Sequence, residues 1–119
     1  MVQTFTLANI TDITGGGITA TASGATFTQT AATSYIFCTF AGSMTVTLNQ
    51  ALFAIGQEIS IADRANFPGR PGNPITVKAT GSVFAIGAGN PLSQLQITKP
   101  QGTLTLFWDG TNFGEKSQF

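Results

Sequence analysis

The chain has 119 residues, of which 42% are hydrophobic and only 8% are charged. This length allows one domain with a modest core and leaves no room for a second. Five basic and five acidic residues give a formal net charge of zero, which argues against a nucleic-acid partner, because phosphate binding requires clustered Lys and Arg. A surface with so little charge favours self-association, so we expect a homo-oligomer.

The first third of the chain contains weaker strand signals. Short stretches rich in Thr and aromatic residues predict strands over residues 3–7, 18–22, 25–30 and 35–40. The N-terminus lacks a basic start followed by an apolar stretch, and no apolar run approaches the length needed to cross a membrane. We therefore expect no signal peptide and no membrane partner. Cys38, the single cysteine, lies in an apolar run and is expected to act as a small buried hydrophobe.

The middle and the end of the chain show clear alternation of apolar and polar residues, which predicts strands with one buried face. These strands cover residues 43–49, 57–62, 75–79, 93–98 and 103–108. No stretch predicts a long helix. The side chains that alternation directs inward are Met44, Val46, Leu48, Ile59, Ile61, Ile75, Val77, Leu95, Ile97, Leu104, Leu106 and Trp108.

Two connections have a recognisable chemistry. Asp109 and Gly110 fit a two-residue hairpin turn, which would place Leu106 opposite Phe113. Residues 63–74 contain three Pro and two Gly, which forbid a central strand there. We expect this segment to be an exposed loop.

Several strands are apolar on both faces. Ile36 and Phe40 extend an apolar run to both sides of their strand, and Phe107 has the parity opposite to that of Trp108. Ile36, Phe40 and Phe107 are therefore candidate subunit-interface residues. The pattern as a whole predicts an all-β fold, an antiparallel, jelly-roll-like β-sandwich of about nine or ten short strands in a single domain spanning residues 1–119.

Chemical sites are not recognisable in this sequence. The chain has no His, which removes the usual general base and the commonest metal ligand. Glu58 and Asp63 have opposite parity on one strand, so they would not face each other as a catalytic pair. Trp108 and Tyr35 could stack on a sugar ring, but the parity of Trp108 favours the core. We expect no enzyme activity, catalytic residue, metal or cofactor.

Three segments of the chain occur in a familiar order. They are MTVTLNQALFAIGQEISIAD, NPITVKATGSVFAIG and LQITKPQGTLTLFWDGTNF. Together they resemble the small β-rich modules of tailed-bacteriophage virion proteins, over roughly residues 35–113, with residues 1–34 as an arm or extra strands. In that resemblance Gly56, Asp63, Asn73-Pro74 and Asp109-Gly110 are structural marks.

The resemblance implies a homotrimer on a virion surface, made in the host cytoplasm. Because the module begins early and the chain ends just past it, a stand-alone capsid decoration or head-fibre subunit is favoured, bound to other virion proteins such as the major capsid protein. One alternative is a tail-fibre or spike tip that recognises host surface glycan. Another is a non-viral carbohydrate-binding or adhesion module.

The loop over residues 63–74 is the expected contact surface for such a partner. Its three prolines reduce the entropy lost when the loop becomes ordered on binding. Arg64, Phe67 and Arg70 are the candidate contact residues, because Arg and aromatic side chains are frequent at binding hot spots.

Overall fold

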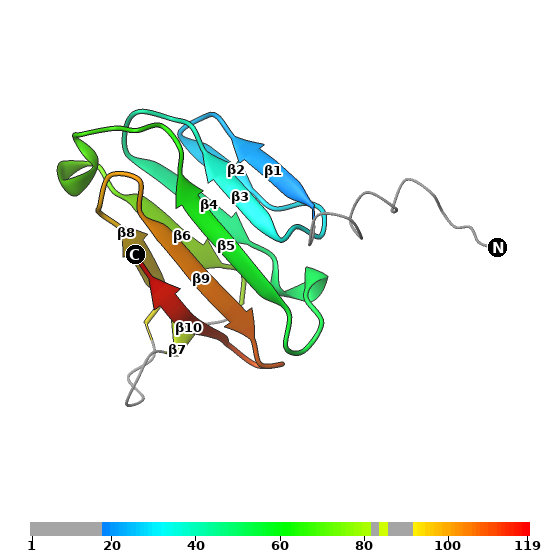
Figure 1. Cartoon of the computed structure of the whole chain (residues 1–119). Helices are drawn as coiled ribbons and strands as arrows, with labels where there is room; N and C mark the ends of the chain where they lie inside the picture. Colours follow the sequence, from blue (N-terminus) through cyan, green and yellow to red (C-terminus); the bar gives the residue numbers. More distant parts are fainter. Residues whose placement is uncertain (1–17, 82–83, 86–91) are drawn as a thin grey trace.

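The computed structural model describes residues 18–81, 84–85 and 92–119, which form two β-sheets lying face to face (Figure 1). Residues 3–7, expected to form a strand, lie outside this part. The elements are β1 (Thr19–Ala22), β2 (Thr26–Thr28), β3 (Tyr35–Cys38), β4 (Met44–Leu48), the 3₁₀ turn η2 (Gln50–Leu52), β5 (Glu58–Asp63), the 3₁₀ turn η3 (Arg70–Gly72), β6 (Ile75–Ala79), β7 (Phe84–Ala85), β8 (Gln94–Ile97), β9 (Thr103–Trp108) and β10 (Phe113–Gln118).

The first six strands alternate between the two sheets. Sheet A has the order β1-β3-β5-β9-β10-β7, and sheet B has the order β2-β4-β6-β8. Among these six, each strand of sheet A and the strand of sheet B that follows it form an arch across the two layers. The three arches, β1–β2, β3–β4 and β5–β6, stack side by side (Figure 1). Neighbouring arches pair in parallel in both sheets.

The prediction of an all-β fold without a long helix is confirmed for the described residues, but the expected antiparallel jelly-roll arrangement is wrong. Only the pairs β5–β9, β9–β10 and β6–β8 are antiparallel in the described chain. Alternation fixes which side chains point inward, but it does not fix the partner of a strand. Here the early connections cross to the opposite sheet, so strands that return to a sheet run in the same direction.

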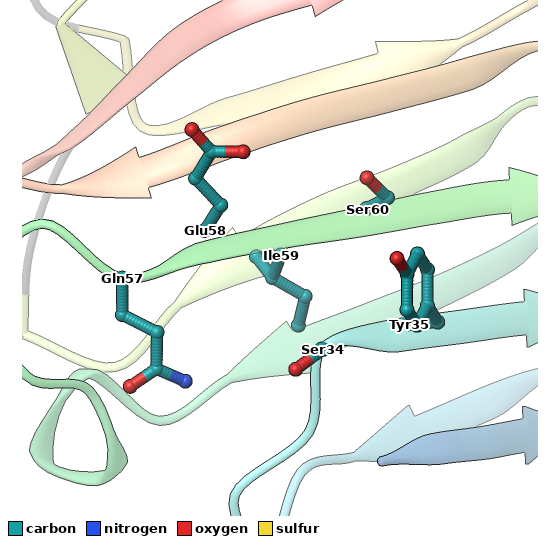
Figure 2. A pocket seen from close by; sticks show the side chains of 6 residues that line it. All are labelled: Ser34, Tyr35, Gln57, Glu58, Ile59 and Ser60. Atoms are coloured by element: carbon teal, nitrogen blue, oxygen red, sulfur yellow. The ribbon is translucent and has the colours of Figure 1, made fainter. Parts of the chain in front are cut away.

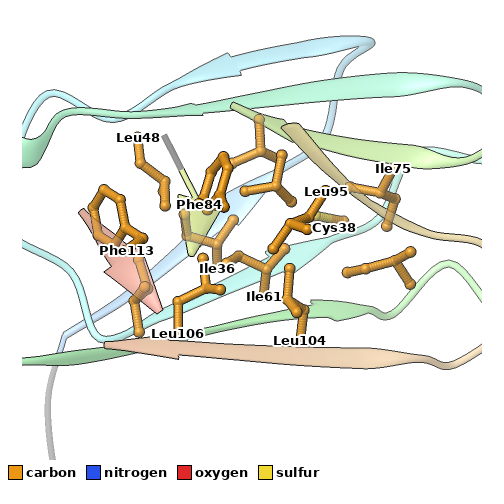
Figure 3. Close-up of a cluster of buried hydrophobic side chains, with 14 of the residues drawn as sticks. Ile36, Cys38, Leu48, Ile61, Ile75, Phe84, Leu95, Leu104, Leu106 and Phe113 are labelled. Carbon is orange, nitrogen blue, oxygen red and sulfur yellow. The ribbon is translucent and has the colours of Figure 1, made fainter. Parts of the chain in front are cut away.

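The core fills the space between the sheets, and Figure 3 shows its side chains interleaved from both layers. All the side chains expected to point inward in the strongly alternating strands are buried. Phe113 and Phe84 close the core beside Trp108, with the ring centroids of Phe113 and Trp108 4.9 Å apart. Burial of each such side chain contributes about 1.5 to 3 kcal/mol.

A buried glutamine joins the first two arches. The Gln29 backbone N–H donates to the Thr47 carbonyl at 2.9 Å, and its Nε2 donates to Thr33 Oγ1 at 2.8 Å. Its Oε1 accepts from the Asn49 backbone N–H at 3.0 Å. Gln29 therefore satisfies the polar groups of a connection that would otherwise be buried without partners.

The hairpin between β9 and β10 has four connecting residues instead of the expected two. Trp108 is opposite Phe113, and Leu106 is opposite Glu115, so the predicted Leu106–Phe113 pairing is wrong by two residues. The turn is longer because Asp109 Oδ1 accepts from the backbone N–H groups of both Thr111 and Asn112, each at 2.7 Å.

Gly110 in this turn has a φ of 100°, where a β-branched side chain is strained. We expect Gly110→Val to lower the free energy of unfolding by about 2 kcal/mol, because the strain is intrinsic to the backbone. Asp109→Ala should cost less, since water can replace its exposed hydrogen bonds. Urea denaturation of both variants measures the difference. An equal loss for the Val and Ala variants would contradict this account.

Candidate functional site

A buried ion pair organises the end of the molecule where β3 and β5 finish. Asp63 ends β5 with the same parity as Ile59 and Ile61, so its carboxylate points into the interior. Arg70 reaches it from η3, with Nη2 3.1 Å from Oδ1 and Nε 3.2 Å from Oδ2. Both side chains are completely buried. This two-pronged contact matches the fork of the guanidinium to the carboxylate.

Arg70 also gathers three backbone carbonyls. Its Nη1 donates to the Gly42 carbonyl at 2.6 Å and to the Asn73 carbonyl at 3.0 Å. Its Nη2 donates to the Phe40 carbonyl at 2.9 Å. One side chain therefore ties together the connection from β3 to β4, the end of β5 and the loop before β6.

The expectation that Arg70 is an exposed contact residue is wrong. Its side chain has no accessible surface, because Asp63 needs a buried cation to balance its charge. Phe67 is half buried and its ring lies 5.1 Å from the Arg70 guanidinium, folded back onto its own loop. Arg64 is exposed and lies 4.7 Å from the centre of the Phe37 ring. The contact role of Arg64 and Phe67 stays a prediction.

The pKa of the Asp63 carboxyl reflects opposing effects. Burial raises this pKa, whereas the hydrogen bond from Arg70 lowers it. The backbone N–H groups of Ala65 and Gln101 also donate to the carboxylate, at 3.0 and 3.2 Å. The hydrogen bonds prevail, and the pKa of Asp63 lies below its usual value of 3.8.

Cys38 lies in the core beside this ion pair and is completely buried, as its sequence context predicted. Burial raises the pKa of its thiol to about 12, with a smaller opposing effect from Arg70. The thiolate is the reactive form of cysteine. The native thiol is therefore inert at neutral pH.

The outer face of sheet A carries three aromatic side chains. Tyr35 and Phe37 point outward from β3, with their ring centroids 6.3 Å apart. Phe107 points outward from β9 and is 37% exposed. Its ring lies over Gly114 of β10, where a Cβ atom would come within 2.6 Å of the ring. Phe107 therefore stays a candidate interface residue, held in place by the glycine beneath it.

The other two candidate interface residues lie deeper. The expectation for Ile36 is wrong, because it is completely buried in the core between the sheets. It shares the inward parity of Cys38, and the outward face of β3 belongs to Tyr35 and Phe37 instead. Phe40 is half buried, packed against the core, and its ring covers Gly42.

A shallow groove of about 260 Å³ lies beside Tyr35 on this face, lined by polar groups from two parallel strands. Figure 2 shows Tyr35 toward one end and Gln57 at the other, with Ser34 just before the start of β3. Glu58 is held by an exposed ion pair, its Oε2 2.7 Å from Nζ of Lys116. The remaining lining residues are Ile59 and Ser60. Such a groove can hold one small polar ring by stacking and hydrogen bonding.

Sequence reasoning named Tyr35 as a possible sugar-stacking residue but missed its polar neighbours. Ser34 lies 23 residues before Gln57 and 26 residues before Ser60 in the chain, and the parallel register of β3 with β5 brings it beside them. Asp63 was missed as a buried group, although its inward parity after Ile59 and Ile61 gave the signal.

No group of three or more His, Cys, Asp or Glu side chains that could hold a metal ion occurs among the described residues. In the same part of the chain, no helix is both long and apolar enough to cross a membrane. A comparison with protein-family models finds no family that matches the chain, and a comparison with curated proteins finds no similar sequence. The chemistry of this protein is therefore inferred from its own residues.

The buried ion pair predicts a large difference between two arginines of one loop. Arg70→Ala should lower the free energy of unfolding by about 3 to 5 kcal/mol, because it leaves the Asp63 charge buried and unpaired. The matched control Arg64→Ala should change it by less than about 0.5 kcal/mol, because Arg64 is exposed. Chemical denaturation measures both. Similar small losses would mean that Arg70 is not the organising residue.

The lowered pKa of Asp63 predicts that the folded protein loses stability in acid. Since its folded-state pKa is lowered, its contribution to stability is complete above its usual pKa of 3.8 and is lost as pH falls through the folded-state pKa. Asp109 titrates in the same direction, because backbone N–H groups lower its pKa. Urea denaturation of Asp109→Asn between about pH 6 and pH 2 should therefore still show falling stability. A flat profile in this variant would remove Asp63 as the cause.

Proposed function

We propose that the protein is a structural subunit of a tailed-phage particle, a capsid decoration or head-fibre protein that acts through multivalent protein contacts. The observation that carries this proposal is the outer face of sheet A, where Tyr35, Phe37 and Phe107 stand among hydroxyl-bearing side chains. Interfaces are enriched in aromatic residues and depleted in Lys, Glu and Asp. This face has the aromatic enrichment without being part of the core, and the Glu58–Lys116 ion pair also lies on it.

The rigidity of the face supports a contact role. Ser60 and Thr105, at the centre of sheet A, join their hydroxyl groups at 2.9 Å. Phe107 is fixed over Gly114, and Arg64 covers part of Phe37. Side chains that are ordered before binding lose less entropy when a partner covers them. The face is therefore suited to repeated contacts of modest individual strength.

The phage context of the proposal rests on the order of the strand segments. The three segments that resemble virion modules supply β4, β5, β6, β7, most of β8, β9 and the turn after β9. Their turn residues have structural roles: Gly56 and Gly110 both have positive φ values. The partner itself, such as the major capsid protein, comes from the resemblance alone.

Replacing the two outward aromatics tests the contact face. The double variant Tyr35→Thr with Phe107→Thr should keep the cooperative thermal transition, because both side chains lie outside the core and Thr suits an exposed strand. It should weaken attachment to purified particles at least tenfold, measured by co-sedimentation with particles that lack the native subunit. Thr45→Ser, on the outer face of sheet B, is the matched control. Unchanged attachment of the double variant, or absence of the wild-type protein from particles, would contradict the proposal.

The groove beside Tyr35 favours a second candidate, recognition of host surface glycan. An aromatic ring beside amide, hydroxyl and carboxylate groups can bind the apolar face and the hydroxyl groups of one sugar ring. A glycan array should then give signals that Tyr35→Ala and Gln57→Ala abolish and Thr45→Ser retains. Binding to no glycan by the wild-type protein would exclude this second candidate and leave the particle contact untouched.

A further inference from the structure

The first arch ends both sheets at the same end of the molecule. β1 is the outermost strand of sheet A, and β2 is the outermost strand of sheet B. The two strands follow each other directly in the chain and lie together at one end of the layers (Figure 1). Within the described part of the chain, no strand pairs with their outer sides.

The backbone directions show which groups face outward from this edge. The carbonyls of Ile18 and Ala22 accept hydrogen bonds from the β3 side. Because successive residues of a strand point their N–H and C=O groups to opposite sides, those of Thr19 and Thr21 face the open edge. In β2, Ala25 and Gln29 bond toward β4, so the groups of Thr26 and Thr28 face the open edge as well.

Two usual protections of an edge strand, charged side chains and proline, are missing from β1 and β2. Native edges are normally guarded by charged side chains, proline, a bulge or short length. The sequence has no charged residue between Asp12 and Glu58 and no proline before Pro68. The opposite edges differ: β7 has only two residues, and Gln118 Nε2 donates to the Gln96 carbonyl on β8 at 2.8 Å. Among the described residues, the far edges are shortened or tied to a neighbouring strand, whereas the edge formed by β1 and β2 has only the short length of its strands as protection.

The core is also incompletely covered at this end. Ala20 and Phe27 point between the sheets from the first arch, yet both are only half buried. Ile18, just before β1, is 41% exposed. A partner that extended both sheets would cover these side chains and complete the core.

We propose that a second copy of this chain pairs with the edge formed by β1 and β2. A two-fold axis normal to the layers sets β1 antiparallel to its partner strand and β2 antiparallel to its own, so that one operation covers both edges. Thr19 then lies opposite the partner's Thr21, and Thr26 opposite the partner's Thr28. Under this axis the outward N–H and C=O groups of each copy meet the same groups of the other copy. The edge carries no charged side chains that such pairing would bring together.

The size of this contact is adequate for association. In an antiparallel pair, two opposite residues whose groups face the partner exchange two hydrogen bonds. The four outward-facing threonines of each copy therefore supply roughly eight bonds across the axis, near the ten or so of an ordinary interface. Burial of Phe27 and Ala20 adds an apolar contact between the two layers.

The test removes the edge N–H groups and leaves the fold. Thr21→Pro with Thr28→Pro deletes two N–H groups that the monomer does not use, and proline is accepted on an edge strand. Thr21→Ala with Thr28→Ala is the matched control, because it removes the side chains and keeps the N–H groups. Light scattering after size exclusion should give a dimer mass for the full-length wild-type and alanine proteins, and a monomer mass for the proline variant.

Hydrogen exchange gives a second readout that needs no variant. Amides of residues 19–28 should exchange more slowly as the wild-type concentration rises through the dissociation constant of the dimer, because pairing covers them. A wild-type monomer at high micromolar concentration, or exchange independent of concentration, would overturn the proposal. If the wild-type protein is a monomer and the proline variant is less stable to heat than the wild type, the occupant of the edge would instead be residues 1–17.

This inference rests on the proposed structural role but fails separately from it. If the wild-type protein and the proline variant both have the mass of a trimer, the edge contact is overturned, but an oligomeric virion subunit is still supported. Loss of the dimer with unchanged attachment of the monomer to particles would support the edge contact and place the particle contact elsewhere. Absence of the protein from particles would count against the virion role without changing the dimer measurement.

Discussion

The contact between Arg70 and Asp63 is the constraint on which the fold depends at the end where β3 and β5 finish. One guanidinium binds the carboxylate that ends β5 and three backbone carbonyls from the neighbouring connections. The backbone N–H of Gln101 donates to the same carboxylate and ties in the turn before β9. Loss of either charge would leave several buried polar groups without partners, each costing about 1 to 3 kcal/mol. The ion pair thus fixes where the second and third arches cross between the sheets.

The few charged residues leave most of the described surface uncharged. Two of only ten charged residues form the buried pair, and the exposed Glu58–Lys116 pair lies on the aromatic face, with Glu58 opposite Phe107. The strands of the first two arches have no charged side chains at all. Under the proposed function, recognition depends on aromatic rings, hydroxyl groups and backbone pairing, which require close contact and gain little from long-range attraction.

The strands and their inward residues could be predicted because a half-buried strand imposes a period of two on its sequence. The prediction for β6 and β9 matches the observed bounds, and the inward sets of β4 and β5 are buried. The pairing could not be predicted, because a crossing connection and a hairpin connection have similar residues. The prediction that Arg70 is exposed failed for a related reason. A proline-rich loop indicates exposure, whereas Arg70 is buried because it pairs with Asp63, which lies seven residues earlier.

The direction of the strands explains why the molecule has two unlike ends. The three arches add strands in one direction, and each new arch covers the edge left by the one before it. After β6 the chain reverses: β8 runs antiparallel to β6, β9 runs antiparallel to β5, and β10 pairs antiparallel with the far side of β9. These antiparallel strands end the stack by covering the third arch. The first arch has no such cover from the strands described, so the same topology that builds the core places its unpaired backbone at one end.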